Sequence, residues 1–141
     1  ADLIKSLYEA GHEIGNHGYF HKDHNKLSYD QNVDEIKTCH TIVKQVANVD
    51  MNLFAPPSGY YNKNTLEVAQ SLGYKTIMWS RDTIDWRDKD SDIVYKRAIN
   101  VKGGDLVLMH PTQHTSQALP SILDYYQQHN IVVTTVSDVL L

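Results

Sequence analysis

The chain has 141 residues, 41% of them hydrophobic, and a formal net charge of −4 from 13 basic and 17 acidic residues. This length predicts a single domain, residues 1–141, with one hydrophobic core. The sequence has no block of Lys and Arg, which argues against nucleic acid as a partner. Its apolar runs are far shorter than the roughly 20 residues that cross a bilayer, and it shows no signal-peptide pattern.

Apolar periodicity and turn residues predict that helices and strands alternate along the chain. Ser28, with Gln31 three residues later, forms a capping box for a long helix, and Gly11 and Gly73 end two others. Alternating βα units indicate a parallel sheet or barrel, but five strands are fewer than the eight of a closed barrel, so a part is absent or the barrel is open. The expected helices are 1–10, 28–47, 65–72, 92–101, 116–129 and a turn from 137, and the expected strands are 12–16, 51–55, 75–80, 106–109 and 131–135.

Polar side chains follow four of the five predicted strands. His17 and His21 follow the first strand, residues 56–59 the second, residues 82–86 the third and residues 110–112 the fourth. The C-terminal ends of parallel strands lie on one face, where binding and catalytic residues collect. We therefore expect these four clusters to converge on one site.

The spacing of His17 and His21 indicates a metal site. Two imidazoles four residues apart reach one ion if the segment makes a helical turn, and imidazole suits zinc, and also cobalt, nickel or iron. The competing interpretation is a pair of solvated surface histidines, but the position at a strand end, directly after Asn16, favours the metal. Since a catalytic zinc usually has three protein ligands, we expect a carboxylate as the third, and we interpret His24 as a loop side chain.

His110 follows four apolar residues at the mouth of a buried strand. An imidazole there is well placed as a general acid or base, although a structural histidine bonded to backbone is the alternative. Asp82 and Asp85 lie at a neighbouring strand end and either could hold His110, while Asp82 is equally well explained as a cap or turn residue. Trp86 is typical of a sugar groove, with a core tryptophan as the alternative.

The run from Pro56 to Gly59 predicts a stiff turn. The backbone N–H groups of Ser58 and Gly59 are expected to point into the site as an oxyanion hole, unless the run is an ordinary surface turn. The remaining histidines sit in or beside predicted helices and are expected to be structural: His40, His114 and His129.

Four segments together resemble the motifs of the polysaccharide deacetylases with the NodB homology domain, carbohydrate esterase family 4. Residues 11–21 resemble the second motif, H-[S/T]-x-x-H, and residues 54–62 the third, R-x-P-[Y]-G. Residues 82–86 resemble the fourth, D-x-x-D-W, and residues 106–110 the fifth, L-x-I-x-H. The motifs occur in the family's order across nearly the whole chain, and their details resemble peptidoglycan deacetylases of spore-forming Gram-positive bacteria.

The resemblance implies a metal-dependent hydrolase that removes N-acetyl groups from amino sugars of peptidoglycan or a chitin-like polysaccharide and releases acetate. His17 and His21 would bind a divalent metal, usually zinc, and His110 would be the general acid, oriented by Asp85. The implied fold is a distorted, incompletely closed βα barrel, and the implied location is extracellular or at the cell wall. The implied substrate-binding residues are Pro57, Ser58 with its N–H as oxyanion donor, Gly59, Trp86, and Leu108 in the pocket for the acetyl methyl.

Three departures from the family pattern are visible. The first motif, T-F-D-D-G, which supplies the catalytic base and an aspartate ligand, is not in this chain. We therefore expect an N-terminally truncated domain without its first strand, with at most slight activity and weak metal binding in isolation. Gly18 replaces the usual Ser or Thr of the second motif, and Ala55 stands where the third has an arginine that pairs with the base. The alternative function is a non-catalytic glycan-binding domain of the same fold.

Overall fold

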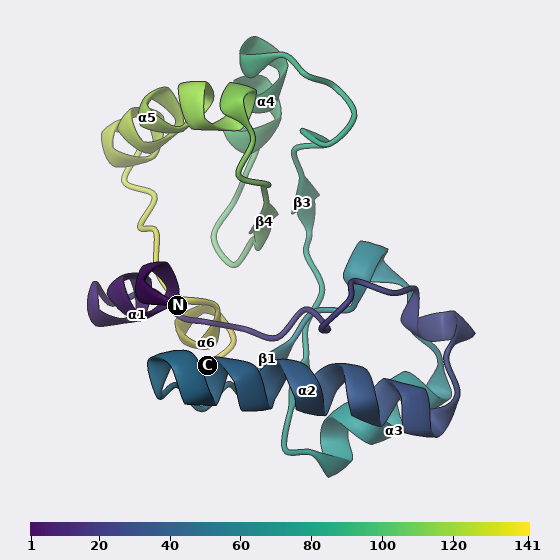
Figure 1. Ribbon diagram of the computed structural model, residues 1–141. Coiled ribbons are helices and arrows are strands. Elements are labelled where there is room, and N and C mark those ends of the chain that lie inside the picture. The colour runs from purple at the N-terminus through teal and green to yellow at the C-terminus, as the bar shows by residue number, and fades with distance from the viewer. The chain divides into compact units, whose positions relative to one another are not determined.

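The computed structural model describes residues 1–141 and divides them into two compact units, residues 1–78 and 79–141 (Figure 1). Each unit has its own two-stranded parallel sheet with helices packed beside it. The alternation of helices and parallel strands expected from the sequence is therefore present in both. No helix is both long and apolar enough to cross a bilayer.

The first unit combines three α-helices with the sheet formed by β1 and β2. Leu53 pairs with Lys75 and Phe54 with Thr76, and Asn16 adds an isolated parallel bridge to Phe54. The elements in chain order are α1 (Asp2–Glu9), the 3-10 turn η1 (His24–Lys26), α2 (Tyr29–Ala47), β1 (Leu53–Phe54), the 3-10 turn η2 (Pro57–Gly59), α3 (Lys63–Ser71) and β2 (Lys75–Thr76).

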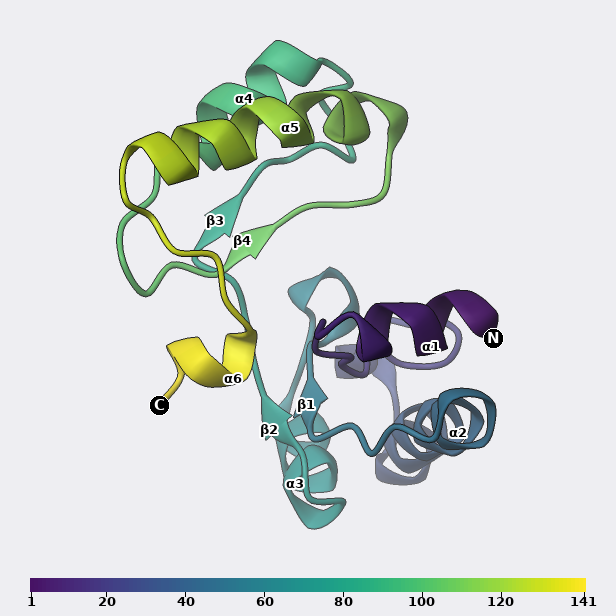
Figure 2. The same ribbon diagram turned by 90° about the vertical axis from the view of Figure 1, so that its left-hand side faces the viewer.

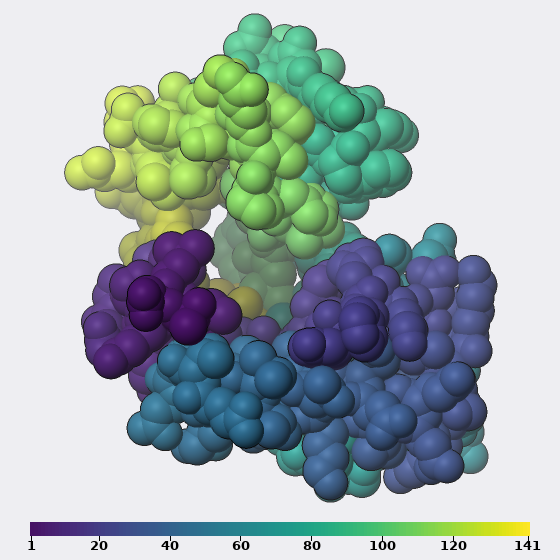
Figure 3. Space-filling view, viewed as in Figure 1, coloured from purple at the N-terminus to yellow at the C-terminus, as the bar shows by residue number.

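Helix α2 is the longest element and carries the core of the first unit. It starts at the predicted capping box, in which Ser28 and Gln31 satisfy each other's backbone N–H groups,. Its inner face packs Ile36 against Phe54 and Val68, and these three residues are fully buried. Its opposite face is exposed along most of the helix, as the blue surface in Figure 3 shows. An amphipathic helix is thereby fixed on β1 by burial of one apolar stripe.

The second unit places two helices side by side above the sheet of β3 and β4 (Figure 2). Arg81 pairs with Val107 and Asp82 with Leu108. The fully buried Ile122 lies in the core between the helices. The elements are β3 (Arg81–Asp82), α4 (Ser91–Ala98), β4 (Val107–Leu108), α5 (Gln113–Gln128) and α6 (Val136–Val139).

The predicted helices are confirmed to within about three residues at each end, but the predicted strands are too long. Residues 12–16 contribute one bridge rather than a strand, and β3 begins after the segment 75–80 that was expected to be one strand. The strand expected at 131–135 is wrong. Its β-branched residues favour a strand, but no strand pairs with the segment. Val132 and Val133 are accordingly 84% and 63% exposed.

Asp105 ties the loop before β4 to the segment that enters β3. Its carboxylate accepts hydrogen bonds from the Lys102 N–H (2.8 Å), the Arg81 Nε (3.0 Å) and the Ser80 hydroxyl (2.8 Å). These bonds lower the pKa of Asp105 from 3.8 to about 2, and the bond from the Lys102 N–H has the largest effect. The ionised carboxylate is thus favoured in the folded chain.

We expect Asp105→Asn to lower the thermal unfolding midpoint at neutral pH, because the ionised acceptor is lost. In the parent chain this stabilisation is complete above a pH of about 4 and disappears as the pH falls through about 2,. The difference between parent and variant should therefore shrink over that range. Circular dichroism melts at several pH values measure it, and a difference that grows on acidification would contradict the assignment.

Candidate active site

His17 and His21 lie on the loop that leaves the Asn16 bridge. Their ring centroids are 4.9 Å apart and the rings are inclined at 72°. The Nδ1 atom of His17 lies 2.6 Å from the carbonyl oxygen of Ala55. Because a carbonyl only accepts, this nitrogen carries the proton, and a backbone carbonyl that accepts one ring N–H is a usual partner of a metal-binding histidine.

The two imidazoles suit a metal as two of its ligands and do not complete a site. No group of three or more His, Cys, Asp or Glu side chains in residues 1–141 has a metal-binding arrangement. His21 adopts a left-handed backbone conformation with φ of 52°, which is uncommon for residues other than glycine. The loop thus holds the histidine pair together at some conformational cost.

His24 is a buried residue of the loop, not a third ligand beside the pair. It is fully buried, and its Nδ1 lies 2.8 Å from the Oδ1 of Asn32. Burial lowers the pKa of His24, against smaller opposing effects from Asn32 and the Glu35 charge. The neutral ring therefore belongs to the interior beneath the loop, and its Nε2 has no hydrogen-bond partner.

The Pro-Pro-Ser-Gly run forms the tight turn η2. Ser58 and Gly59 have φ values of 56° and 73°, so a serine occupies the left-handed region. The Gly59 N–H donates to the carbonyl of Pro56 at 3.0 Å, so the prediction that it points into the site is wrong: the turn itself uses this donor. The Ser58 N–H donates to no group of the chain, and its role as an oxyanion donor stays a prediction.

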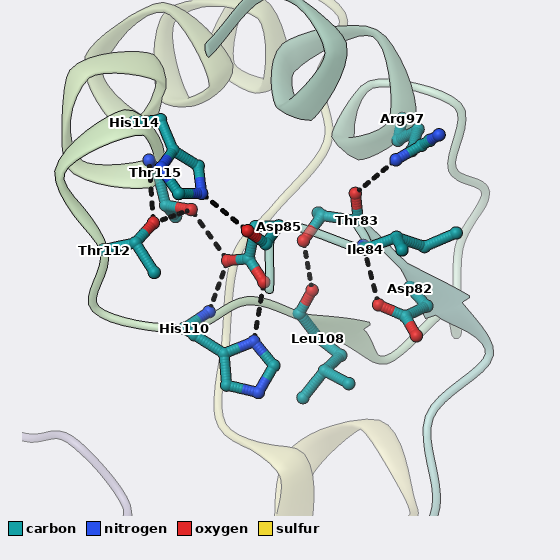
Figure 4. A network of polar contacts seen from close by, with 10 residues as sticks. All are labelled: Asp82, Thr83, Ile84, Asp85, Arg97, Leu108, His110, Thr112, His114 and Thr115. Atoms are coloured by element: carbon teal, nitrogen blue, oxygen red, sulfur yellow. Dashed lines mark hydrogen bonds and ion pairs between the residues drawn. The ribbon is translucent and has the colours of Figure 1, made fainter. Parts of the chain in front are cut away.

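Asp85 and His110 form a tight pair in the second unit (Figure 4). Asp85 is fully buried, and its carboxylate accepts from the His110 Nδ1 (2.6 Å), the His110 backbone N–H (2.6 Å) and the Thr115 hydroxyl (2.7 Å). Burial by itself raises the pKa of Asp85, but these hydrogen bonds outweigh it and hold the pKa below 3.8. Asp85 is therefore ionised at neutral pH.

The charge on Asp85 fixes the orientation of His110. An ionised carboxylate only accepts hydrogen bonds, so the His110 Nδ1 carries a proton. The side chain of His110 is 40% exposed while that of Asp85 is 0% exposed. The remaining ring nitrogen, Nε2, is thus the atom that can exchange a proton with a substrate, as a general acid or base must.

Asp82 is a turn residue rather than the partner of His110. Its carboxylate accepts the Ile84 N–H at 2.8 Å, and Ile84 has φ of 53°, which is rare for a β-branched residue. The buried Thr83 donates its hydroxyl to the Leu108 carbonyl at 2.8 Å. These contacts fix the turn that delivers Asp85.

The sequence interpretation missed Thr115 as a partner of Asp85 and gave His114 only a general structural role. Thr112 caps α5 by accepting the Thr115 N–H, and the same turn brings the Thr115 hydroxyl to Asp85. The Nε2 of His114 donates to the backbone carbonyl of Asp85 at 2.6 Å. The Thr-x-x-Thr spacing was readable as a cap, but nothing local indicates that the second threonine reaches a carboxylate 30 residues away.

Trp86 and Leu108 are both placed in the second unit. Trp86 is 58% exposed, which excludes the alternative of a core tryptophan. Leu108 lies in β4 and is partly buried. Their contacts with a glycan stay predictions.

Comparisons with known proteins identify the family of this chain. The family model described as polysaccharide deacetylase matches residues 1–77. A peptidoglycan-N-acetylglucosamine deacetylase of Bacillus cereus is 30% identical over 145 residues, which cover 98% of this chain and 68% of the relative. The chain therefore belongs to the polysaccharide deacetylase family, as its motifs indicated.

Other relatives include proteins without established activity. An uncharacterized protein of Bacillus subtilis, YlxY, is 31% identical over 98% of this chain and 44% of its own length. The solved structure of a family 4 carbohydrate esterase pseudoenzyme from Bacillus anthracis is 30% identical, with a TM-score of 0.93 over 99% of this chain and 50% of that one. The chain thus spans about half the length of several relatives, and it shares the fold of this esterase family, which is consistent with an open βα barrel.

We expect Thr115→Val to raise the pKa of Asp85, because one of the bonds that lower it is removed. The change should destabilise the chain by about 1.5 to 3 kcal/mol, the usual value of a hydrogen bond to a charged group. Urea unfolding and an NMR titration of the Asp85 carboxyl measure the two effects. Ser116→Ala, at the exposed neighbouring position, is the control, and equal behaviour of the two variants would contradict the role given to Thr115.

Proposed function

We propose that this chain is part of a metal-dependent deacetylase that removes N-acetyl groups from amino sugars of peptidoglycan or a chitin-like polysaccharide and releases acetate. The observation that carries the proposal is the buried Asp85 carboxylate bonded to the Nδ1 of His110 at 2.6 Å, in a chain of the polysaccharide deacetylase family. Such a pair is suited to protonate a departing amine. A peptidoglycan substrate would place the protein outside the cell or at the cell wall.

The first unit supplies the proposed metal ligands. His17 and His21 present two imidazoles, and the Ala55 carbonyl fixes the tautomer of His17. A divalent metal, zinc in our proposal with cobalt, nickel or iron as alternatives, would supply Lewis-acid polarisation of the acetamide carbonyl. The N–H of Ser58 would donate to the oxygen of that carbonyl as it gains charge, with Pro57 and Gly59 holding the turn.

The second unit supplies the proposed acid and sugar contacts. His110 would deliver a proton from Nε2 to the nitrogen that leaves, and Asp85 would keep the ring oriented and stabilise its charged form. Leu108 would contact the acetyl methyl, and the exposed indole of Trp86 would pack on a sugar ring. The catalytic base of the family belongs to its first motif, so we also propose that the isolated chain deacetylates at most slowly.

In the intact protein that contains this chain, we expect His110→Ala to lower kcat for acetate release by roughly 10²- to 10⁴-fold, the usual contribution of a general acid. Acetate is measured enzymatically with N-acetylglucosamine oligomers and with peptidoglycan as substrates. His129→Ala, at an exposed histidine of the same unit, is the control and should leave kcat unchanged. Full activity of His110→Ala would contradict the proposed acid.

A non-catalytic glycan-binding domain is the second candidate. It is favoured by Ala55, which replaces the arginine of the family's third motif, and by the match to a pseudoenzyme with a TM-score of 0.93. In this case Asp85 and His110 would serve the structure of the second unit alone. Glycan would be bound and released unchanged.

Glycan binding without acetate release distinguishes the second candidate from the first. Calorimetry with N-acetylglucosamine oligomers should then show that Trp86→Ala weakens binding by roughly 3- to 10-fold, the size of one aromatic contact. His110→Ala should bind as the parent does. Stoichiometric zinc together with acetate release by the intact protein would rule this candidate out.

A further inference from the structure

Three consecutive backbone N–H groups lie between the two proposed metal ligands, and a side chain from the interior accepts each of them. The Gly18 N–H donates to the Oδ1 of Asn16 at 2.9 Å. The Tyr19 and Phe20 N–H groups donate to the same oxygen of Glu35, Oε2, at 3.1 and 2.8 Å. The whole loop between His17 and His21 is therefore attached through its backbone.

Both acceptors are held by the core of the first unit. Asn16 is 1% exposed and donates its Nδ2 to the Ile36 carbonyl and to the Tyr74 hydroxyl. Glu35 is 4% exposed and precedes Ile36, which is fully buried, on α2. A loop bonded to these two side chains thus takes its position from α2 and from the bridge to Phe54.

A carboxylate buried at the position of Glu35 is unfavourable unless hydrogen bonds replace water. Two successive N–H groups pointing at one oxygen provide this compensation, as in an anion-binding nest. The other oxygen, Oε1, lies 3.5 Å from the half-exposed ammonium group of Lys22. The carboxylate and the loop backbone therefore stabilise each other.

Gly18 allows the loop to approach this carboxylate closely. Its φ is +74°, and a Cβ atom there would lie 3.0 Å from the His24 Nε2 and 3.4 Å from the Glu35 Oε2. Any larger side chain would have to displace the buried His24 ring or the carboxylate. Because Gly18 has no side chain, the loop backbone can lie directly against the Glu35 carboxylate.

We propose that Glu35 is a positioning residue, which together with Asn16 holds His17 and His21 in the arrangement that binds a metal. The inference rests on the metal site of the proposed function and adds a residue to it. The acceptor atom of Glu35 fixes the loop backbone before any ion is present. Metal binding then does not have to order the loop, and the metal binds more tightly because this entropic cost is avoided.

The test compares side chains of similar length with and without an acceptor. In Glu35→Gln the carboxamide oxygen accepts the same two N–H groups, whereas in Glu35→Met no acceptor remains. Asp34→Met, at the exposed preceding position of α2, is the control. In the intact protein that contains this chain, hydrogen exchange at the Tyr19 and Phe20 amides is followed by NMR without metal, and Zn²⁺ is then titrated while the histidine ring signals are observed.

We expect Glu35→Met to accelerate exchange at both amides and to weaken zinc binding roughly 10- to 100-fold, as loss of a supporting contact to metal ligands does. Glu35→Gln should keep both amides protected and zinc affinity within about threefold of the parent, because the acceptor is retained. If Glu35→Met does not fold, Glu35→Asp replaces it, since its carboxylate is one methylene too short to reach both amides.

Parent-like exchange and zinc affinity in folded Glu35→Met would overturn the inference, and so would accelerated exchange with unchanged affinity. Loss of affinity in Glu35→Gln equal to that in Glu35→Met would also overturn it, because the acceptor would then not be the cause. Absence of zinc binding by the parent form of the intact protein would contradict the metal site of the proposed function. Accelerated exchange in Glu35→Met alone would then still support the attachment of the loop to Glu35.

Discussion

A buried carboxylate has to be surrounded by hydrogen-bond donors, and each unit of this chain is organised around one. In the second unit the donors to Asp85 come from the segment after β4 and from α5. In the first unit the donors to Glu35 are backbone amides of the loop after Asn16. Removing one donor would leave the buried charge less compensated, and a hydrogen bond to a charged group contributes more than one between neutral groups. The polar segments of both units are therefore positioned by a buried charge as well as by the apolar core.

This constraint is associated with strained backbone in the loops. His21, Ser58 and Ile84 all have positive φ. His21 and Ser58 are themselves candidate site residues, and Ile84 directly precedes Asp85. Conformations of this kind persist only where surrounding contacts determine them. For Ile84 the contact is the carboxylate of Asp82, which accepts its N–H. The loops therefore have defined conformations although they lack regular secondary structure.

The sequence predicted what depends on local chemistry. Helix α2 begins at the capping box formed by Ser28 and Gln31, since both partners lie within one turn. From the residues alone either Asp82 or Asp85 could hold His110, and the family resemblance implied Asp85. The turn at Ile84 gives the physical reason, because Asp82 accepts the Ile84 N–H and Asp85 is left to bond His110. Glu35 was not singled out: a charged residue on a long helix is usually solvated, and its burial depends on a loop elsewhere in the chain. The segment 131–135 shows the opposite case: its residues favour a strand locally, but no neighbouring strand pairs with it.

The Asp85–His110 contact does not by itself separate an enzyme from a glycan-binding relative. Asp85 needs its donors in order to be buried, so the contact would stabilise the second unit whether or not a proton is transferred. The histidine pair of the first unit is different. His17 and His21 are exposed, and the Nδ1 of His17 lies 2.6 Å from the Ala55 carbonyl oxygen. The backbone of His21 is in the left-handed region, and the loop that carries both rings is bonded to buried side chains. Of the two proposed functions, only the metal-dependent one uses both imidazoles as ligands, so the histidine pair, and not the Asp85–His110 contact, is the feature on which the two proposals differ.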